Sequence, residues 1–266
     1  MTPRSSRALG LGAALLLAAA PALRAQNAPA PDRRPTIAVL YFNNGAIGRA
    51  ADFEALSKGI ADLLITDLSA NPNIRVVERD RLQQLLEEQD LSQTNRIDDA
   101  TALRLGKVLG AHHIIKGGFV VDPKGRMRLD AHAVNVETTK VDYVETVSGK
   151  SDDVLDLISQ LSTKLNQGLH LPELSAAPGP RDGAGSSDAR PSDGAPSGAS
   201  GGGKQVASSN IKGSPFQAVM LYSRALAAED QGKTAEAVEL YKKTLAVFPD
   251  NEKAKARLAK LEGGSE

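Results

Sequence analysis

The side chains best able to do chemistry in this chain are its four histidines, because cysteine is absent. His112 and His113 open a predicted strand, so their side chains point to opposite faces of the sheet and cannot bind one metal ion. His132 lies on a neighbouring predicted strand, within reach of one of them. We expect no metal site here. The alternative, a small-molecule binder or hydrolase at this sheet edge, predicts a deep polar pocket beside the three histidines.

Acidic residues, the other source of acid–base chemistry, stand where carboxylates have structural roles. Asp98 and Asp152 begin predicted helices, where a carboxylate caps free amide groups and suits the positive end of the helix dipole. Glu78-Arg79 joins a predicted strand to a predicted helix, and is interpreted either as part of a partner-binding surface or as an ion pair at that junction. With no His-Glu-x-x-His zinc motif and no cysteine nucleophile, we expect no enzyme, no catalytic residue and no cofactor.

The elements that must position these side chains form an α/β domain over residues 35–171. A continuous apolar run at 36–42 has the length and β-branched content of a buried strand. Apolar residues at three- and four-residue spacing then predict an amphipathic helix over 53–68, and 74–77 is a second strand. Two strands joined by a helix run parallel, because the crossover is right-handed.

More helices and an antiparallel meander complete this domain. The pattern predicts helices at 79–89 and 98–109, strands at 114–121, 126–136 and 141–147, and a last helix at 152–167. Short polar loops between the three later strands favour antiparallel pairing. The predicted fold class is therefore α/β, with a mixed sheet of about five strands covered by helices.

The first 25 residues are typical of a secretory signal peptide. Arg4 and Arg7 precede an unbroken run of Ala, Leu and Gly that is too short to span a bilayer, and small residues up to Ala25 offer a cleavage site. An uncleaved anchor helix is the alternative. Residues 26–34 are predicted to be a disordered leader. Because the chain has no cysteine for lipid attachment, we expect a soluble periplasmic protein that contacts the outer membrane only through partners.

Charge and aromatic content argue against nucleic acid as a partner. The chain has 32 basic and 32 acidic residues, so it lacks the positive excess that phosphate binding needs. Aromatic residues make up 3% and tryptophan is absent, which leaves little for stacking on bases.

The second half of the chain predicts a linker and a small helical domain. Residues 172–213 are dominated by Gly, Ser, Pro and Ala and are predicted to be disordered. Helices are then predicted at 218–229, 234–247 and 251–261, within a helical domain over 214–262.

The segment 232–249 resembles the second half of a tetratricopeptide repeat. Ala225, Ala237, Tyr241 and Pro249 match the repeat pattern, whereas Leu221, Arg224, Ala228 and Thr244 depart from it. The resemblance implies that the first helix binds a partner through Val219, Tyr222, Leu226 and Glu229. In the alternative interpretation Tyr222 and Leu226 are core residues. One repeat cannot bury both faces, so we expect it to pack on a partner, on a second copy, or to form a minimal hairpin closed by its last helix.

The α/β domain carries a resemblance of its own. The segments are Ile-Ala-Val-Leu-Tyr-Phe (37–42), Ile-Arg-Val-Val-Glu-Arg-Asp-Arg-Leu (74–82), Leu-Leu-Glu-Glu (85–88), and Leu-Gly-Lys-Val-Leu-Gly-Ala (105–111) before Ile-Lys-Gly (115–117). In this order they resemble the CsgG-type periplasmic domain, across residues 35–169. That family includes the curli secretion channel, a holdfast anchor protein, and FlgO-like and penicillin-binding-protein-activator domains.

The resemblance implies a non-enzymatic periplasmic scaffold or accessory protein that helps to assemble an envelope machine for secretion, adhesion, motility or cell-wall synthesis. Its expected partners are other envelope proteins or further copies of itself. Two departures narrow this expectation: the chain lacks the cysteine of the lipoprotein members, and its short hairpins leave no strands for a membrane barrel. An oligomeric outer-membrane secretion channel remains the alternative within the family.

Overall fold

The computed structural model describes residues 32, 34–48, 50–91, 97–169 and 211–263. The predicted signal peptide lies outside the described residues, as do most of the predicted leader and linker. None of the described helices combines the length and the apolar character needed to cross a membrane.

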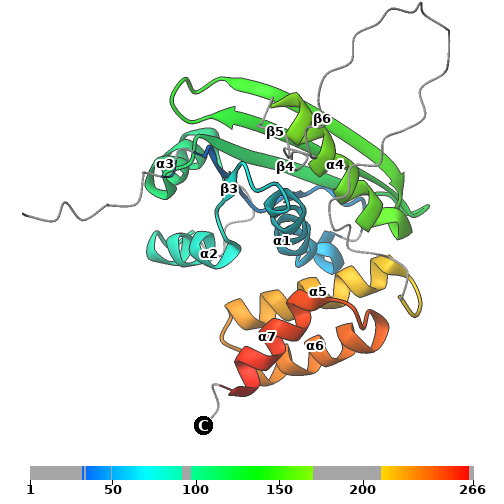
Figure 1. Cartoon of the computed structure of the whole chain (residues 1–266). Helices are drawn as coiled ribbons and strands as arrows, with labels where there is room; N and C mark the ends of the chain where they lie inside the picture. Colours follow the sequence, from blue (N-terminus) through cyan, green and yellow to red (C-terminus); the bar gives the residue numbers. More distant parts are fainter. Residues whose placement is uncertain (1–31, 33, 49, 92–96, 170–210, 264–266) are drawn as a thin grey trace, which may run out of the picture. The chain divides into compact units, whose positions relative to one another are not determined.

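A six-stranded mixed sheet forms the framework of the α/β domain, in the order β3-β1-β4-β5-β6 with β2 paired to β4 (Figure 1). β1 runs parallel to β3 and β4, and β4, β5 and β6 form an antiparallel meander. This arrangement confirms the predicted α/β fold and its mixed sheet. The strands are β1 (Thr36–Val39), β2 (Asn43–Asn44), β3 (Arg75–Val76), β4 (His113–Val121), β5 (Arg126–Asn135) and β6 (Val141–Lys150).

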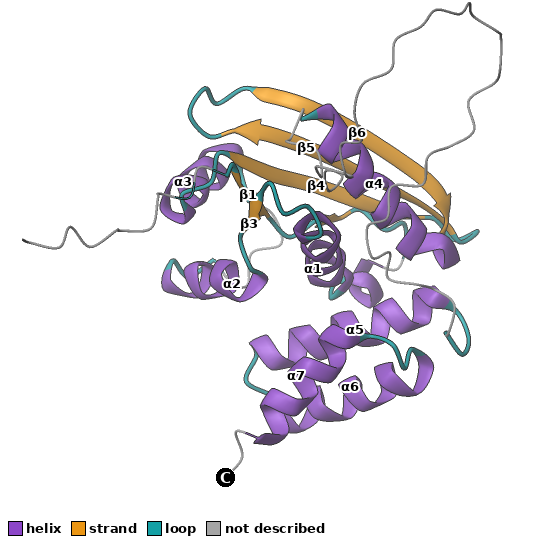
Figure 2. Ribbon diagram, in the orientation of Figure 1, coloured by secondary structure: helices purple, strands orange, loops and turns teal. Residues whose placement is uncertain are grey.

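Helices cover the sheet on both sides of β1 (Figure 2). Ile37 and Val39 point into a large apolar cluster with α1 and α4, whereas Ala38 and Leu40 point into a second cluster with α2 and α3. Burial on both faces explains why the first strand is continuously apolar. The helices are α1 (Leu56–Ser69), α2 (Arg79–Glu88), α3 (Asp99–Leu109), α4 (Val154–Gly168), α5 (Pro215–Asp230), α6 (Thr234–Val247) and α7 (Glu252–Gly263), with short 3₁₀ helices η1 (Ala50–Phe53) and η2 (Ser151–Asp153).

Local sequence signals explain most element ends. Asp98 caps α3, because its Oδ1 accepts a hydrogen bond from the Thr101 amide at 2.8 Å, and Gly110 ends the helix at φ 64°. The strand predicted at 36–42 is shorter than expected, because the amide of Phe42 bonds to Ser57 rather than to a strand. Asp152, in contrast to Asp98, does not act as the expected helix cap. Its carboxylate accepts a hydrogen bond from the Ser214 hydroxyl instead.

The C-terminal helices pack on the α/β domain itself. α5 contacts α1 and α4, and Ala218, Val219, Met220 and Phe248 belong to the same apolar cluster as the sheet. The expected minimal hairpin closed by its last helix is formed, because α7 packs on α6 and shares an apolar cluster with α5 and α6. Packing on a partner or on a second copy stays a prediction. The chain's own α1 supplies the surface that one helical repeat lacks.

Candidate functional site: a charge cluster between α1, α2, α5 and α7

The site begins where α1 and α5 approach each other most closely. A Cβ atom on Gly59 would lie 1.8 Å from Ser223 Oγ and 2.8 Å from Ser223 Cβ, so only glycine fits at this position. Ser223 is fully buried, and its hydroxyl donates to the Val219 carbonyl within α5. The crossing brings the polar side chains that follow on each helix into contact.

Asp62 lies one turn after Gly59 and is completely buried. Its Oδ2 accepts a hydrogen bond of 2.6 Å from the hydroxyl of Tyr222 on α5. Its Oδ1 lies 3.4 Å from Nζ of Lys253 on α7 and 3.8 Å from Nε of Arg79 on α2. A buried carboxylate must be compensated, and here three different elements do so.

Arg79 connects α2 to the end of α5. Its Nη1 donates to both carboxylate oxygens of Asp230 at 2.9 Å, and its Nη2 donates to Asp80 at 3.2 Å. Asp230 also accepts a hydrogen bond of 2.5 Å from Lys58 Nζ, and its side chain is 5% exposed. The end of α5 is thus held by one cation from α1 and one from α2.

Arg257 of α7 closes the cluster. It donates to Asp80 on α2 at 2.6 Å and to Glu229 on α5 at 3.0 Å. Glu229 accepts a further hydrogen bond of 2.6 Å from the Tyr241 hydroxyl on α6. Four cations, on Lys58, Arg79, Lys253 and Arg257, therefore face four carboxylates, on Asp62, Asp80, Glu229 and Asp230.

Burial and neighbouring charges shift the pKa values of Tyr222, Arg79 and Asp80. Burial and the nearby Asp62 carboxylate raise the pKa of the Tyr222 phenol well above its usual value, so it stays a donor. Burial opposes the charge on Arg79, yet Tyr41 and Asp230 raise the pKa of its guanidinium. Partial burial acts against ionisation of Asp80, but the hydrogen bond and charge of Arg257 lower its pKa. The paired carboxylates and cations hold the helices of the cluster together.

The residues predicted to bind a partner all lie at or near this cluster, but most are already engaged within the chain. Val219, Tyr222 and Leu226 are buried, and Glu229 bonds to Tyr241 and Arg257. Their burial agrees with the alternative interpretation of Tyr222 and Leu226 as core residues, and the partner role stays a prediction.

Glu78 and Arg79 separate in the structure. Glu78 is exposed, whereas Arg79 is buried and bonds to Asp230 and Asp80. The ion pair expected between the two neighbours is replaced by contacts with α5. Gly59, Asp62 and Asp230 were not predicted as site residues from the sequence. One signal was present: Asp62 is a charged residue inside the apolar stripe of α1.

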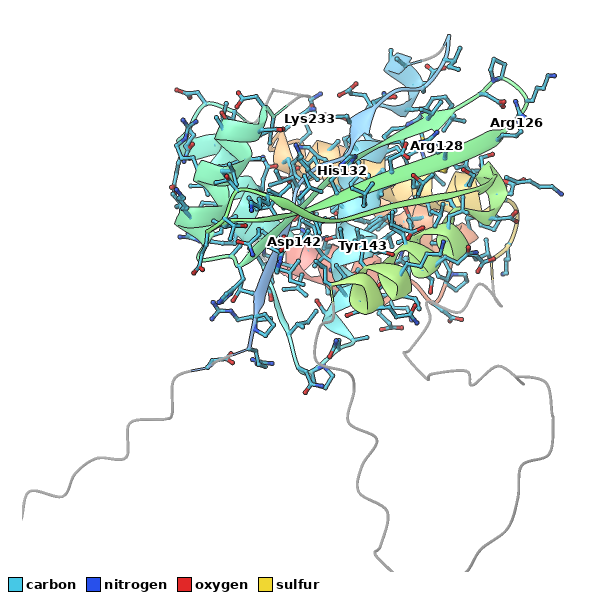
Figure 3. The ribbon with its side chains drawn as sticks, turned by 90° about the horizontal axis from the view of Figure 1, so that it is seen from above. Arg126, Arg128, His132, Asp142, Tyr143 and Lys233 are labelled. Carbon is cyan, nitrogen blue, oxygen red and sulfur yellow. The ribbon has the colours of Figure 1, made fainter. Side chains whose placement is uncertain are left out.

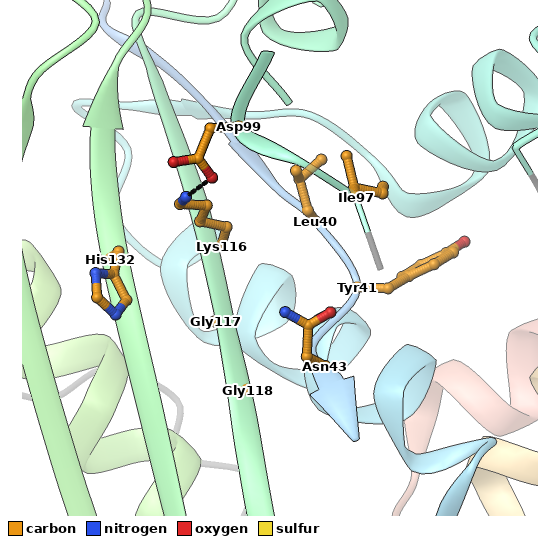
Figure 4. A pocket seen from close by; sticks show the side chains of 9 residues that line it. All are labelled: Leu40, Tyr41, Asn43, Ile97, Asp99, Lys116, Gly117, Gly118 and His132. Carbon is orange, nitrogen blue, oxygen red and sulfur yellow. Dashed lines mark hydrogen bonds and ion pairs between the residues drawn. The ribbon is translucent and has the colours of Figure 1, made fainter. Parts of the chain in front are cut away.

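Two of the three described histidines, His112 and His113, are bonded within the fold. His112 Nδ1 accepts a hydrogen bond from the Thr36 amide at 3.0 Å, and His113 Nε2 lies 2.9 Å from Asp142 Oδ2. His132 lines a hollow of about 270 Å³ together with the Asp99–Lys116 ion pair (Figure 4). Neither His112 nor His113 lines this hollow, so it does not bring the three histidines together. Within the described residues no group of three or more potential ligands is placed to hold a metal ion.

Among the described helices, only α3 packs on one face of the meander, at Ile114 near the start of β4, and β5 and β6 are open there. α4 covers the other face of β5 and β6, where Tyr143 and Glu145 lie. The open face carries alternating side chains of β5 and β6 (Figure 3). They are Arg128, Asp130 and His132 on β5, and Val144, Thr146 and Ser148 on β6.

Comparison with known proteins finds one family model that matches part of the first half of the chain. Residues 18–122 match the family model described as "Curli production assembly/transport component CsgG". This is less than half of the chain and ends after β4, short of the resemblance expected to residue 169. It indicates a CsgG-like domain. No comparison confirms the tetratricopeptide-like interpretation, and no curated protein matches the chain.

Solved structures give similarities of low score. The LpoB C-terminal domain from Salmonella enterica is 14% identical, with a TM-score of 0.33, covering 44% of this chain and 82% of that chain. The PelC dodecamer from Paraburkholderia phytofirmans is 14% identical (TM-score 0.34; 55% and 94% covered). Lipoprotein GNA1162 from Neisseria meningitidis is 12% identical (TM-score 0.36; 50% and 99% covered). Values this low say nothing about what the chain binds.

Proposed function

We propose that this protein is a non-enzymatic periplasmic scaffold that binds other envelope proteins during assembly of an envelope machine. The observation that carries the proposal is the CsgG-like match over residues 18–122, in a chain whose first 25 residues have the pattern of a secretory signal. The family description concerns assembly and transport, which are tasks of protein–protein contact.

The charge cluster supports a scaffold rather than a reaction centre. Its carboxylates and cations are paired with one another across four helices, so they fix the C-terminal helices on the α/β domain. A rigid unit presents its exposed faces in a fixed relation, which reduces the entropy lost on binding.

The open face of the meander is the surface we propose for partner binding. Arg128 is exposed and paired with Asp130, and the neighbouring strand adds the exposed Val144 and Thr146. Mixed charge with a few apolar side chains is typical of interfaces between proteins that also exist apart.

Site-specific photo-crosslinking in intact cells tests this proposal. A crosslinking amino acid at Arg128 should capture a specific envelope protein, whereas the same amino acid at Asp156, exposed on α4 at the opposite face, should not. Fractionation of the same cells should recover the cleaved chain in the periplasm. Failure of both positions to capture any specific protein would count against the scaffold role. Recovery as a membrane-inserted ring would favour the channel alternative.

A further inference from the structure

The last strand, β6, has an unusually open edge. It is ten residues long and pairs only with β5 among the described strands. The opposite edge of the sheet, β3, has two residues. Native proteins usually shorten or cover an edge strand, because its unpaired amides and carbonyls invite another strand. Two of the four exposed large hydrophobic residues in the described chain, Val141 and Val144, lie on β6.

Hydrogen bonds at the end of β6 show which residues present their backbone to this edge. The Ser151 amide donates to the Gly125 carbonyl at 2.8 Å, so position 151 points toward β5. Backbone direction alternates along an antiparallel strand. Positions 144, 146, 148 and 150 therefore direct their amide and carbonyl groups outward. A register shift between Ala133 and Val134 disturbs only the other end, near Asp142.

We propose that β6 pairs with β6 of a second copy of this chain, antiparallel and around a two-fold axis at Thr146. Ten strands would then form one continuous path through the two main sheets. This contact goes beyond the binding of other envelope proteins proposed above, and does not depend on it.

Side-chain pairing on β6 favours this register. Centred on Thr146, the pairing sets Val144 opposite Ser148 of the second copy. Like charges across a strand pair destabilise it. Centring on Glu145 would set two glutamates against each other, and centring on Val147 would shorten the overlap. The Asp142 carboxylate is already bonded to His113 and Asn135, so it brings no unpaired charge to this contact.

The face covered by α4 also accepts this register. Tyr143 lies opposite Gly149 of the second copy, where no side chain competes for space. Glu145 lies opposite Val147, and its charge is already paired with Lys164 at 2.8 Å. No like-charged pair arises on either face, so the edge is complementary to itself.

Disulfide trapping tests the register directly, because the chain has no cysteine of its own. In a hydrogen-bonded pair the two Thr146 Cα atoms would lie about 5.5 Å apart, within the range of a disulfide. Thr146→Cys should therefore form a covalent dimer under mild oxidation. Ser148→Cys alone should not, because its two copies would lie about 13 Å apart along the strands. An equal mixture of Val144→Cys and Ser148→Cys should crosslink.

Sedimentation of the mature, cysteine-free chain across a dilution series provides the second measurement. Ser148→Pro removes an outward amide without touching the β5 ladder and should abolish the dimer, while circular dichroism shows the fold retained. The proposal is overturned if Thr146→Cys crosslinks no better than Ser148→Cys, or if the chain is monomeric at every concentration. It is equally overturned if a dimer forms that Ser148→Pro leaves intact.

Discussion

α1 packs mainly against two helices, α4 and α5, and the two contacts differ in kind. Toward α4 the contact is apolar, through one shared cluster that includes Leu64, Leu68, Ile158 and Leu161. Toward α5 it combines a close backbone approach at Gly59 with the buried Asp62–Tyr222 hydrogen bond. α4 and α5 each bury one side of α1, but of these two helices only α5 donates a hydrogen bond to the buried Asp62 carboxylate.

The difference between the α1–α4 and α1–α5 contacts shows what determines the position of each helix. An apolar stripe accepts any helix of suitable shape, because apolar burial has no direction. A buried carboxylate accepts only a surface that brings donors to it, since an uncompensated buried charge is very costly. We infer that the burial of apolar surface holds α4 on α1. The position of α5 to α7 is set instead by the hydrogen bonds and ion pairs of Asp62, Arg79 and Asp230. The predictions below test that contrast.

The largest effect is expected from Arg79→Met. The substitution keeps much of the buried volume but leaves Asp230 and Asp62 without their shared cation. Removing one partner of a buried ion pair costs about 3–5 kcal/mol. Urea unfolding should show that loss in the free energy of unfolding. Arg81→Met, on the exposed side of the same helix, is the control and should change it by less than about 0.5 kcal/mol.

A smaller loss is expected from Gly59→Ala. The new methyl group would meet Ser223 Oγ and Cβ at distances that no relaxed structure allows, so α5 must shift. Overpacking of this kind costs about 1–3 kcal/mol, and outweighs the better helix propensity of alanine. Adding Ser223→Gly should recover part of the loss in a double-mutant cycle. Gly263→Ala, where nothing lies within 4 Å, is the matched control. Equal losses at both glycines would show that the close approach does not hold α5.

The α/β domain could be predicted from the sequence because its signals are local. The apolar run at 36–42, the cap at Asp98 and the stop at Gly110 each act within a few residues. Both hairpins of the meander are closed by short loops, which fix the order of β4, β5 and β6. Each of these features depends on neighbours in the chain.

The charge cluster could not be predicted in the same way. Asp62 and Tyr222 are 160 residues apart, and Arg79 and Asp230 are 151 apart. Nothing local says which cation will face a given carboxylate. The position of Asp62 does indicate a buried interaction, since a charge within an apolar stripe requires a partner. Glu78 and Arg79 both lie in the segment 74–82, which resembles the CsgG-type domain, but only Arg79 bonds to the other residues of the cluster.

Tyr222→Phe should have a moderate effect. It keeps the aromatic ring, which lies 6.1 Å from that of Tyr241, but removes the only hydroxyl bonded to Asp62 Oδ2 among the described residues. A buried acceptor left unsatisfied costs about 1–3 kcal/mol. Tyr241→Phe removes a bond to Glu229, which keeps Arg257 as a partner, and should cost less. Equal losses in urea unfolding would contradict the special place of Asp62.

The smallest effect concerns Asp67, a second carboxylate on α1. Burial raises its pKa above the usual 3.8, to about 6, whereas Asp62 has a donor and cations around it. A raised pKa in the folded state means that Asp67 favours folding only when protonated. Its contribution is therefore fully present below about pH 4 and is lost as the pH rises through about 6.

Asp67→Asn should remove this dependence. At pH 4 the variant and the parent should have the same free energy of unfolding, and at pH 7 the variant should be more stable by about 1–2 kcal/mol, after allowance for partial exposure. Urea unfolding between pH 4 and 7 measures the difference between the two curves. Asp156→Asn removes one negative charge from the exposed side of α4 and is the control. Parallel curves for Asp67→Asn and its parent would mean that α1 tolerates a half-buried carboxylate at position 67 at no cost in stability, and the contrast drawn from Asp62 would fail.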